Sequence, residues 1–97
     1  MTHLPSAILT IHLRLAGCRS LKEKRGRLLP LLHRLHREFN VSTAEMDLQD
    51  HWQEAVIACG MVASDRIHLE RSLQTVAGWV EAHWPDGEVL DQRIELV

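Results

Sequence analysis

The chain of 97 residues is 45% apolar and 25% charged, which is typical of one globular domain over residues 1–97 and argues against disorder. Its net charge of −2 hides a strong segregation. Residues 14–37 hold eight basic residues and one acid, whereas residues 38–97 hold three basic residues and twelve acids. No apolar stretch is long enough to cross a bilayer, and the first residues do not resemble a signal peptide, so we expect a cytoplasmic protein with no membrane partner.

The first half of the chain predicts a strand, a helix and a second strand. Apolar and polar residues alternate from Ser6 to Leu15, a period of two that is typical of a strand with one buried face. The segment from Ser20 to Glu23 has the capping-box form that starts a helix. Leucines at helical spacing continue toward Asn40, and Pro30 within them predicts a kinked helix. Residues 41–49 are expected to form the second strand.

The second half predicts a strand, a helix and a last strand. Residues 52–63 carry apolar side chains on both faces, so both faces of this strand should be covered, with Cys59 as a small core residue. Ser64 is the expected N-cap of a helix whose buried stripe ends at Trp84. Residues 85–87 form a turn signal, and a strand is expected over residues 88–97.

The element order β-α-β-β-α-β indicates an α+β ferredoxin-like sandwich, in which a four-stranded antiparallel sheet carries both helices on one face. The other face of the sheet is then left open, with apolar side chains from the first and third strands. Because an exposed apolar patch of this kind usually marks a protein interface, we expect a homodimer through this face. The candidate interface residues are Ile8, Val56, Ala58 and Val62.

Five basic side chains gather at the start of the first helix. The free N–H groups and the dipole of a helix start already favour anions, so this region is a candidate contact for an RNA backbone. The alternative is a solvated helix face. Base stacking on the sheet is disfavoured, because its open face offers no aromatic residue. The candidate nucleic-acid-binding residues are Arg19, Lys22, Lys24, Arg25 and Arg27.

Other candidate sites are weak. Glu45, Asp47, Asp50 and His51 lie at the hairpin between the two middle strands, where they could bind a metal ion, face solvent or touch a dimer partner. Nothing in their spacing fixes a ligand geometry, so no metal site is assigned. Motifs of nucleophilic, nucleotide-dependent and zinc-dependent enzymes are absent from the sequence. We therefore expect no catalytic residue, no cofactor and no small-molecule substrate.

Several segments in order carry a resemblance to a known family. They are S-L-K-E-K-R at 20–25, F-N-V-S at 39–42, A-E-M-D at 44–47, Q-D-H-W-Q at 49–53 and S-D-R at 64–66. Together they make the chain similar to the YlxP-like family of small bacterial domains of unknown function. The resemblance implies a ferredoxin-like fold that often pairs into dimers. It also implies a link to translation or ribosome assembly, because genes of the family often lie beside genes for initiation and ribosome-maturation factors.

Two functional hypotheses follow. The first is a non-catalytic accessory protein that contacts RNA or the ribosome through the basic helix start. The second is a homodimeric protein–protein interaction module that acts through its open sheet face and has no nucleic-acid role. The two differ in whether the basic residues are free or are paired with the acids of the protein itself.

Overall fold

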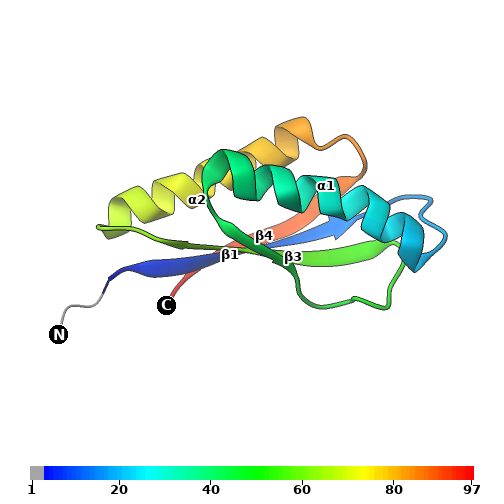
Figure 1. Ribbon diagram of the computed structural model, residues 1–97, viewed down its shortest axis with the longest axis horizontal. Coiled ribbons are helices and arrows are strands. Elements are labelled where there is room, and N and C mark those ends of the chain that lie inside the picture. The colour runs from blue at the N-terminus through cyan, green and yellow to red at the C-terminus, as the bar shows by residue number, and fades with distance from the viewer. Residues whose placement is uncertain (1–3) are drawn as a thin grey trace.

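The computed structural model describes residues 4–97, and residues 1–3 lie outside the described part. It has the α+β ferredoxin-like fold that the sequence predicts, with a four-stranded sheet covered on one face by two helices (Figure 1). The elements in chain order are β1 (Ser6–Arg14), α1 (Leu21–Phe39), β2 (Ser42–Glu45), β3 (Glu54–Val62), α2 (Arg66–His83) and β4 (Glu88–Leu96).

The sheet is antiparallel throughout, with the strand order β2-β3-β1-β4. The two central strands therefore come from opposite halves of the chain, and β2 and β4 form the two edges. The register places Leu9 of β1 beside Cys59 of β3 on one side and beside Ile94 of β4 on the other. A β-bulge interrupts the pairing of β1 with β4 after His12.

The core lies between the sheet and the helices. Alternate residues of both central strands are fully buried, among them Leu9, Ile11 and Ile57, and they meet the leucine and valine stripes of the helices. This confirms the alternation predicted for β1. On β3 the helix-facing residues are covered, but the expected cover of both faces is not found within residues 4–97, where Val62 on the other face is 60% exposed. The second face of the sheet is open.

Helix α1 begins and ends at its predicted residues. The Ser20 hydroxyl accepts a hydrogen bond from the Glu23 amide at 3.0 Å, and Asn40 closes the helix in the left-handed region at φ 55°. The Glu23 carboxylate accepts from the Arg19 amide at 3.2 Å, one residue before the position that a full capping box uses. The helix runs across Pro30 as one element, as the unbroken phase of its leucine stripe predicts.

Two boundaries differ from the prediction. The middle strands are shorter, because residues 46–53 leave the sheet in a loop in which Leu48 adopts φ 62°, a conformation that no strand accommodates. The N-cap of α2 is Asp65 and not Ser64. The Asp65 carboxylate accepts from the His68 amide at 2.8 Å, and the helix begins at the next residue, Arg66.

Candidate protein-binding face and basic helix start

Lys24 is the one predicted RNA contact that the fold places inside the protein. Its side chain is only 1% exposed. The ammonium donates to the carbonyls of Leu48 and His51, both at 2.7 Å, and forms an ion pair at 2.8 Å with Glu45. The ammonium is therefore held inside the protein by two hydrogen bonds and one ion pair, and the prediction that Lys24 contacts phosphate is wrong. The signal was in the sequence, because Lys24 precedes Leu28 by one helical turn and shares its buried stripe.

Arg27 is held by the loops beside it. Its guanidinium donates to the carbonyls of Ala16 and Asp86, and it lies 3.7 Å from the Glu23 carboxylate and 3.8 Å from that of Asp86. The side chain is 19% exposed, so most of its surface is covered by these contacts. Arg27 therefore links the start of α1 to the turn before β4. These contacts hold the guanidinium in place and leave it little freedom to bind a phosphate group.

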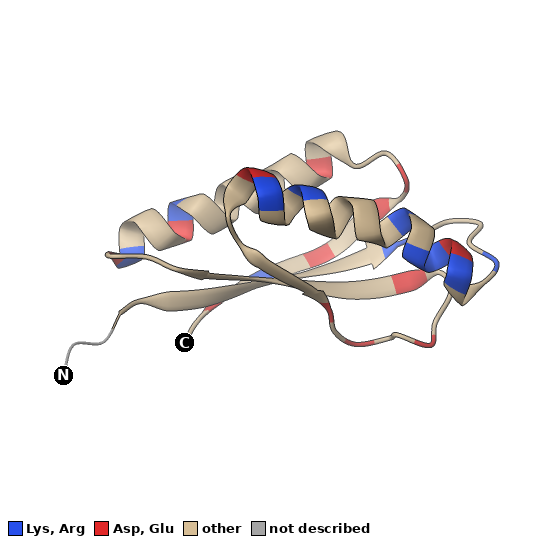
Figure 2. Cartoon of the chain, in the orientation of Figure 1, with Lys and Arg blue, Asp and Glu red and all other residues tan. Residues whose placement is uncertain are grey.

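The other three basic residues at the start of α1 face solvent. Arg19, Lys22 and Arg25 are exposed, and none of them forms an ion pair within residues 4–97. Figure 2 shows blue residues at the first turns of α1 and red residues along the β2–β3 loop below them. The five-residue basic cluster expected from the sequence is thus reduced to three free cations.

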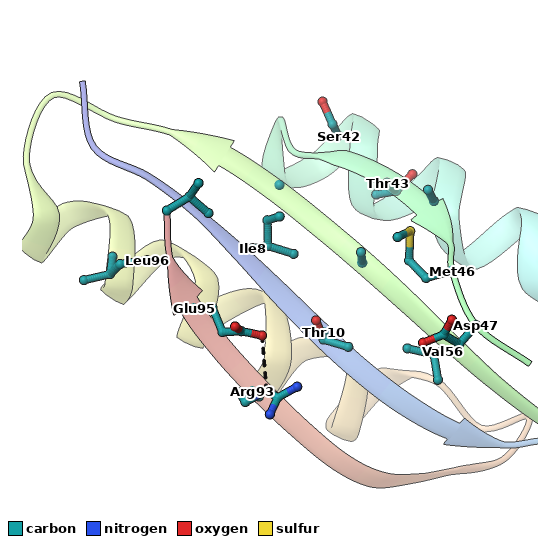
Figure 3. Close-up of a pocket in the computed structure, with 14 residues that line it drawn as sticks. Ile8, Thr10, Ser42, Thr43, Met46, Asp47, Val56, Arg93, Glu95 and Leu96 are labelled. Atoms are coloured by element: carbon teal, nitrogen blue, oxygen red, sulfur yellow. Dashed lines mark ion pairs between the residues drawn. The ribbon is translucent and has the colours of Figure 1, made fainter. Parts of the chain in front are cut away.

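The open face of the sheet carries a shallow groove of about 530 Å³ (Figure 3). Small residues of β2 and β3 form its floor, including Ala44, Ala58 and Gly60. Ile8 stands at its centre and is 41% exposed. All four candidate interface residues lie on this face: Ile8, Val56, Ala58 and Val62, the last of them 60% exposed.

Two further apolar side chains extend this face and were not predicted. Met46 and Trp52 lie on the β2–β3 loop and are 53% and 51% exposed. Met46 lines the groove, and Trp52 lines a smaller hollow beside Glu54 at the start of β3. Both fall in a segment that the sequence suggested would be mostly strand. The alternation of that segment gave no sign that these side chains would be left in solvent.

Each basic residue of the open face has an acid beside it, whereas two acids of this face, Asp47 and Asp91, form no ion pair within residues 4–97. His12 lies 2.8 Å from Glu54, and Arg14 lies 2.8 Å from Glu88. On β4, Arg93 lies 3.3 Å from Glu95, the pair marked in Figure 3. Within the described residues the face therefore presents no unpaired cation to a partner, and its excess charge is negative.

Comparison with known proteins decides the family. Residues 7–94 match the family model described as "Protein of unknown function (DUF503)". The chain belongs to this family. It is also 40% identical, over 76 residues, to the uncharacterized protein YlxP of Bacillus subtilis (strain 168), an alignment that covers 78% of this chain and 82% of that protein. The resemblance predicted from the sequence is confirmed.

Neither cysteine of this DUF503 protein has the environment of a reactive thiol. Burial raises the pKa of the Cys59 thiol from 9.0 to about 11, which keeps it protonated at neutral pH. Cys18 is also fully buried, and its thiol donates to the Ser20 carbonyl at 3.5 Å. Within residues 4–97, no three His, Cys, Asp or Glu side chains gather as a metal site, and Glu45 of the predicted hairpin cluster is occupied by Lys24. No helix in this part of the chain is long and apolar enough to span a membrane.

Proposed function

We propose that this DUF503 protein is a non-catalytic interaction module that pairs with a second copy of itself through the open face of its sheet. The observation that carries the proposal is the groove, which has an apolar centre at Ile8 and whose neighbouring basic residues are already paired with acids. An apolar face whose basic residues are already paired loses little on leaving water, and Asp47 and Asp91 are the acids of this face that lack an ion pair within residues 4–97.

The pattern of the face is self-complementary about one row of residues. Thr43, Cys59, Leu9 and Ile94 lie side by side across the four strands. We place two copies with their open faces together and a two-fold axis between them, parallel to this row. The axis then sets each strand against the same strand of the other copy, and residues equally far from the row on opposite sides face each other. Val62 of one copy then lies over Val56 of the other, Ala58 over Gly60, and Ile8 over Thr10. Large side chains meet at the ends of β3, and small ones meet in the middle.

The available area suits a stable dimer. Three of the four strands have nine residues. Strands about 4.8 Å apart with a rise of about 3.3 Å per residue give each residue about 16 Å² of the face, so the three nine-residue strands and the four-residue β2 together cover about 500 Å². Specific interfaces bury about 800 Å² of solvent-accessible surface per partner. This surface follows the side chains, so it is larger than the flat area of the sheet. Met46 and Trp52 would add to the contact.

Glutamate at either end of β3 should break this pairing. We expect Val56→Glu and Val62→Glu each to weaken self-association at least tenfold (about 1.4 kcal/mol or more), because an unpaired carboxylate would be buried against the facing copy. Sedimentation velocity over a concentration series measures the effect. Ile67→Glu is the matched control, since Ile67 is 65% exposed on α2 and away from the face. A wild-type protein that stays monomeric at every concentration would contradict the proposal.

A second function has its own support. Arg19, Lys22 and Arg25 remain free at the start of α1, so weak contact with an RNA backbone is proposed as the alternative. Such binding should tolerate any sequence and fall steeply with salt. Replacing all three with glutamate should flatten the slope of log affinity against log salt by about 0.7–0.9 per lost contact. Lys24 should stay untouched in this variant, because its loss would disturb the fold. No binding of single-stranded or structured RNA at low salt would exclude this alternative.

A further inference from the structure

The outer edge of β4 is the longest free edge of the sheet. It runs for nine residues, whereas the opposite edge, β2, has four, and no strand within residues 4–97 pairs with its outer side. Most side chains of β4 are exposed, and among them Leu96 is 40% exposed. A long free edge presents unpaired N–H and C=O groups that another strand can use.

The hydrogen-bond pattern tells which residues point outward. The Val97 amide donates to the Ser6 carbonyl at 2.8 Å, so residues 97 and 6 form a hydrogen-bonded pair. In an antiparallel ladder such pairs alternate, so Glu95 and Arg93 also turn their backbone groups toward β1. The intervening residues, Gln92, Ile94 and Leu96, therefore direct their N–H and C=O groups to the free edge, where the Gln92 amide donates to the exposed Asp91 carboxylate at 2.9 Å, a contact that a pairing strand would replace. Before Asp91 the bulge ends this regular pattern.

If two β4 strands pair in an antiparallel way, the register decides which residues hydrogen-bond through these outward N–H and C=O groups and which side chains lie opposite each other. A register centred on Arg93 places the two Arg93 side chains opposite each other and Asp91 opposite Glu95, which are like charges. A register centred on Gln92 has to use Leu90, which lies in the bulge. A register centred on Ile94 uses the regular segment 91–97 alone. It pairs Ile94 with its copy and Gln92 with Leu96, and it sets Arg93 opposite Glu95 in both directions.

We propose that a second copy of this chain pairs with the outer edge of β4 in the register centred on Ile94. Charge complementarity selects the second copy as the partner, since Arg93 and Glu95 of each chain meet their opposites on the same face of the sheet. The existing pair of Arg93 with Glu95 does not oppose this, because both side chains are more than half exposed and either can turn to a new partner. The pairing also brings the exposed side chain of Leu96 against the neighbouring strand.

This edge pairing is distinct from the face pairing proposed above and compatible with it. Its two-fold axis is perpendicular to the sheet at Ile94, and the face-to-face axis runs along the row that contains Ile94. Two perpendicular two-fold axes that meet at one point generate a closed tetramer and not an open fibre. In this tetramer each chain uses its open sheet face for one contact and the outer edge of β4 for the other.

Proline at an outward position tests the edge without touching the ladder to β1. In the Val62→Glu background, where the face pairing is removed, we expect a dimer that Gln92→Pro abolishes and the control Gln92→Ala retains. In the same background, Arg93→Glu should weaken the dimer about tenfold, and adding Glu95→Arg should restore it. Sedimentation velocity gives the mass of each variant, and circular dichroism checks that it is folded.

The outcomes separate the two proposals. A monomer in the Val62→Glu background, with a wild-type dimer, overturns the edge pairing and leaves the face pairing in place. A wild-type dimer that is unaffected by Val62→Glu but is lost with Gln92→Pro supports the edge pairing and overturns the face pairing. If the Gln92→Pro variant does not fold, the Arg93→Glu and Glu95→Arg variants test the edge pairing by themselves. A dimer that is unaffected by Arg93→Glu then overturns the register centred on Ile94.

Discussion

Replacing Lys24 with methionine is expected to lower the free energy of unfolding by about 3–5 kcal/mol. Methionine keeps most of the length of the buried stem but removes the ammonium. Glu45 then loses its ion-pair partner, and the carbonyls of Leu48 and His51 lose their donor. An uncompensated buried carboxylate is among the largest single penalties in proteins of this size, whose total stability is about 5–15 kcal/mol. Urea unfolding followed by circular dichroism measures the change.

Two comparisons isolate the role of Lys24. Lys22→Met changes the same residue type on the exposed side of the same helix, and it should alter stability by less than about 0.5 kcal/mol. Adding Glu45→Gln to Lys24→Met should recover part of the loss, because the stranded charge is removed. A loss below about 1 kcal/mol for Lys24→Met would mean that water replaces the ammonium in this site.

Alanine at Gly87 is the second change with a large expected effect. A Cβ atom built at Gly87 would overlap the backbone carbonyl oxygen of Arg14 and would lie 3.2 Å from the Trp84 ring. Because the obstructing atom belongs to the backbone of β1, relief requires β1 or the turn before β4 to move. We expect Gly87→Ala to destabilise the protein by about 2–3 kcal/mol, measured as a fall in the urea midpoint.

Gly26→Ala serves as the control for this substitution. Gly26 lies within α1, and a Cβ there meets no atom within 4 Å. Alanine has the higher helix propensity, so this change should stabilise the protein by about 0.5–1 kcal/mol. If Gly87→Ala lowers the stability and Gly26→Ala raises it, the loss at Gly87 is due to its close approach to β1. A neutral Gly87→Ala would show that the turn relaxes freely.

The fold could be predicted from the sequence because its signals are periodic and agree with one another. The alternation in β1, the leucine stripe of α1 and the Ser20 cap each specify a local element, and the element order then leaves few topologies. The open face was predictable for the same reason. A period of two assigns Val56, Ala58 and Val62 to one side of β3 once the other side is known to be covered.

The errors come from contacts between distant segments. Lys24 was grouped with its basic neighbours by residue type, although its position on the leucine stripe directs it inward to acceptors that lie 24 and 27 residues away. The same contacts draw residues 46–53 out of the sheet and shorten both middle strands. The exposure of Met46 and Trp52 follows from this loop, so no local pattern could predict it.

The buried ammonium of Lys24 also sets an order of assembly. The β2–β3 loop closes on a donor that belongs to α1, so the hairpin cannot complete its native loop until that helix has docked on the sheet. Before docking, Leu48 has no Lys24 ammonium to hold its left-handed backbone, which is unfavourable for a bulky residue. We therefore expect the loop to be among the last parts of the chain to become ordered during folding, because its contact with Lys24 spans a quarter of the chain.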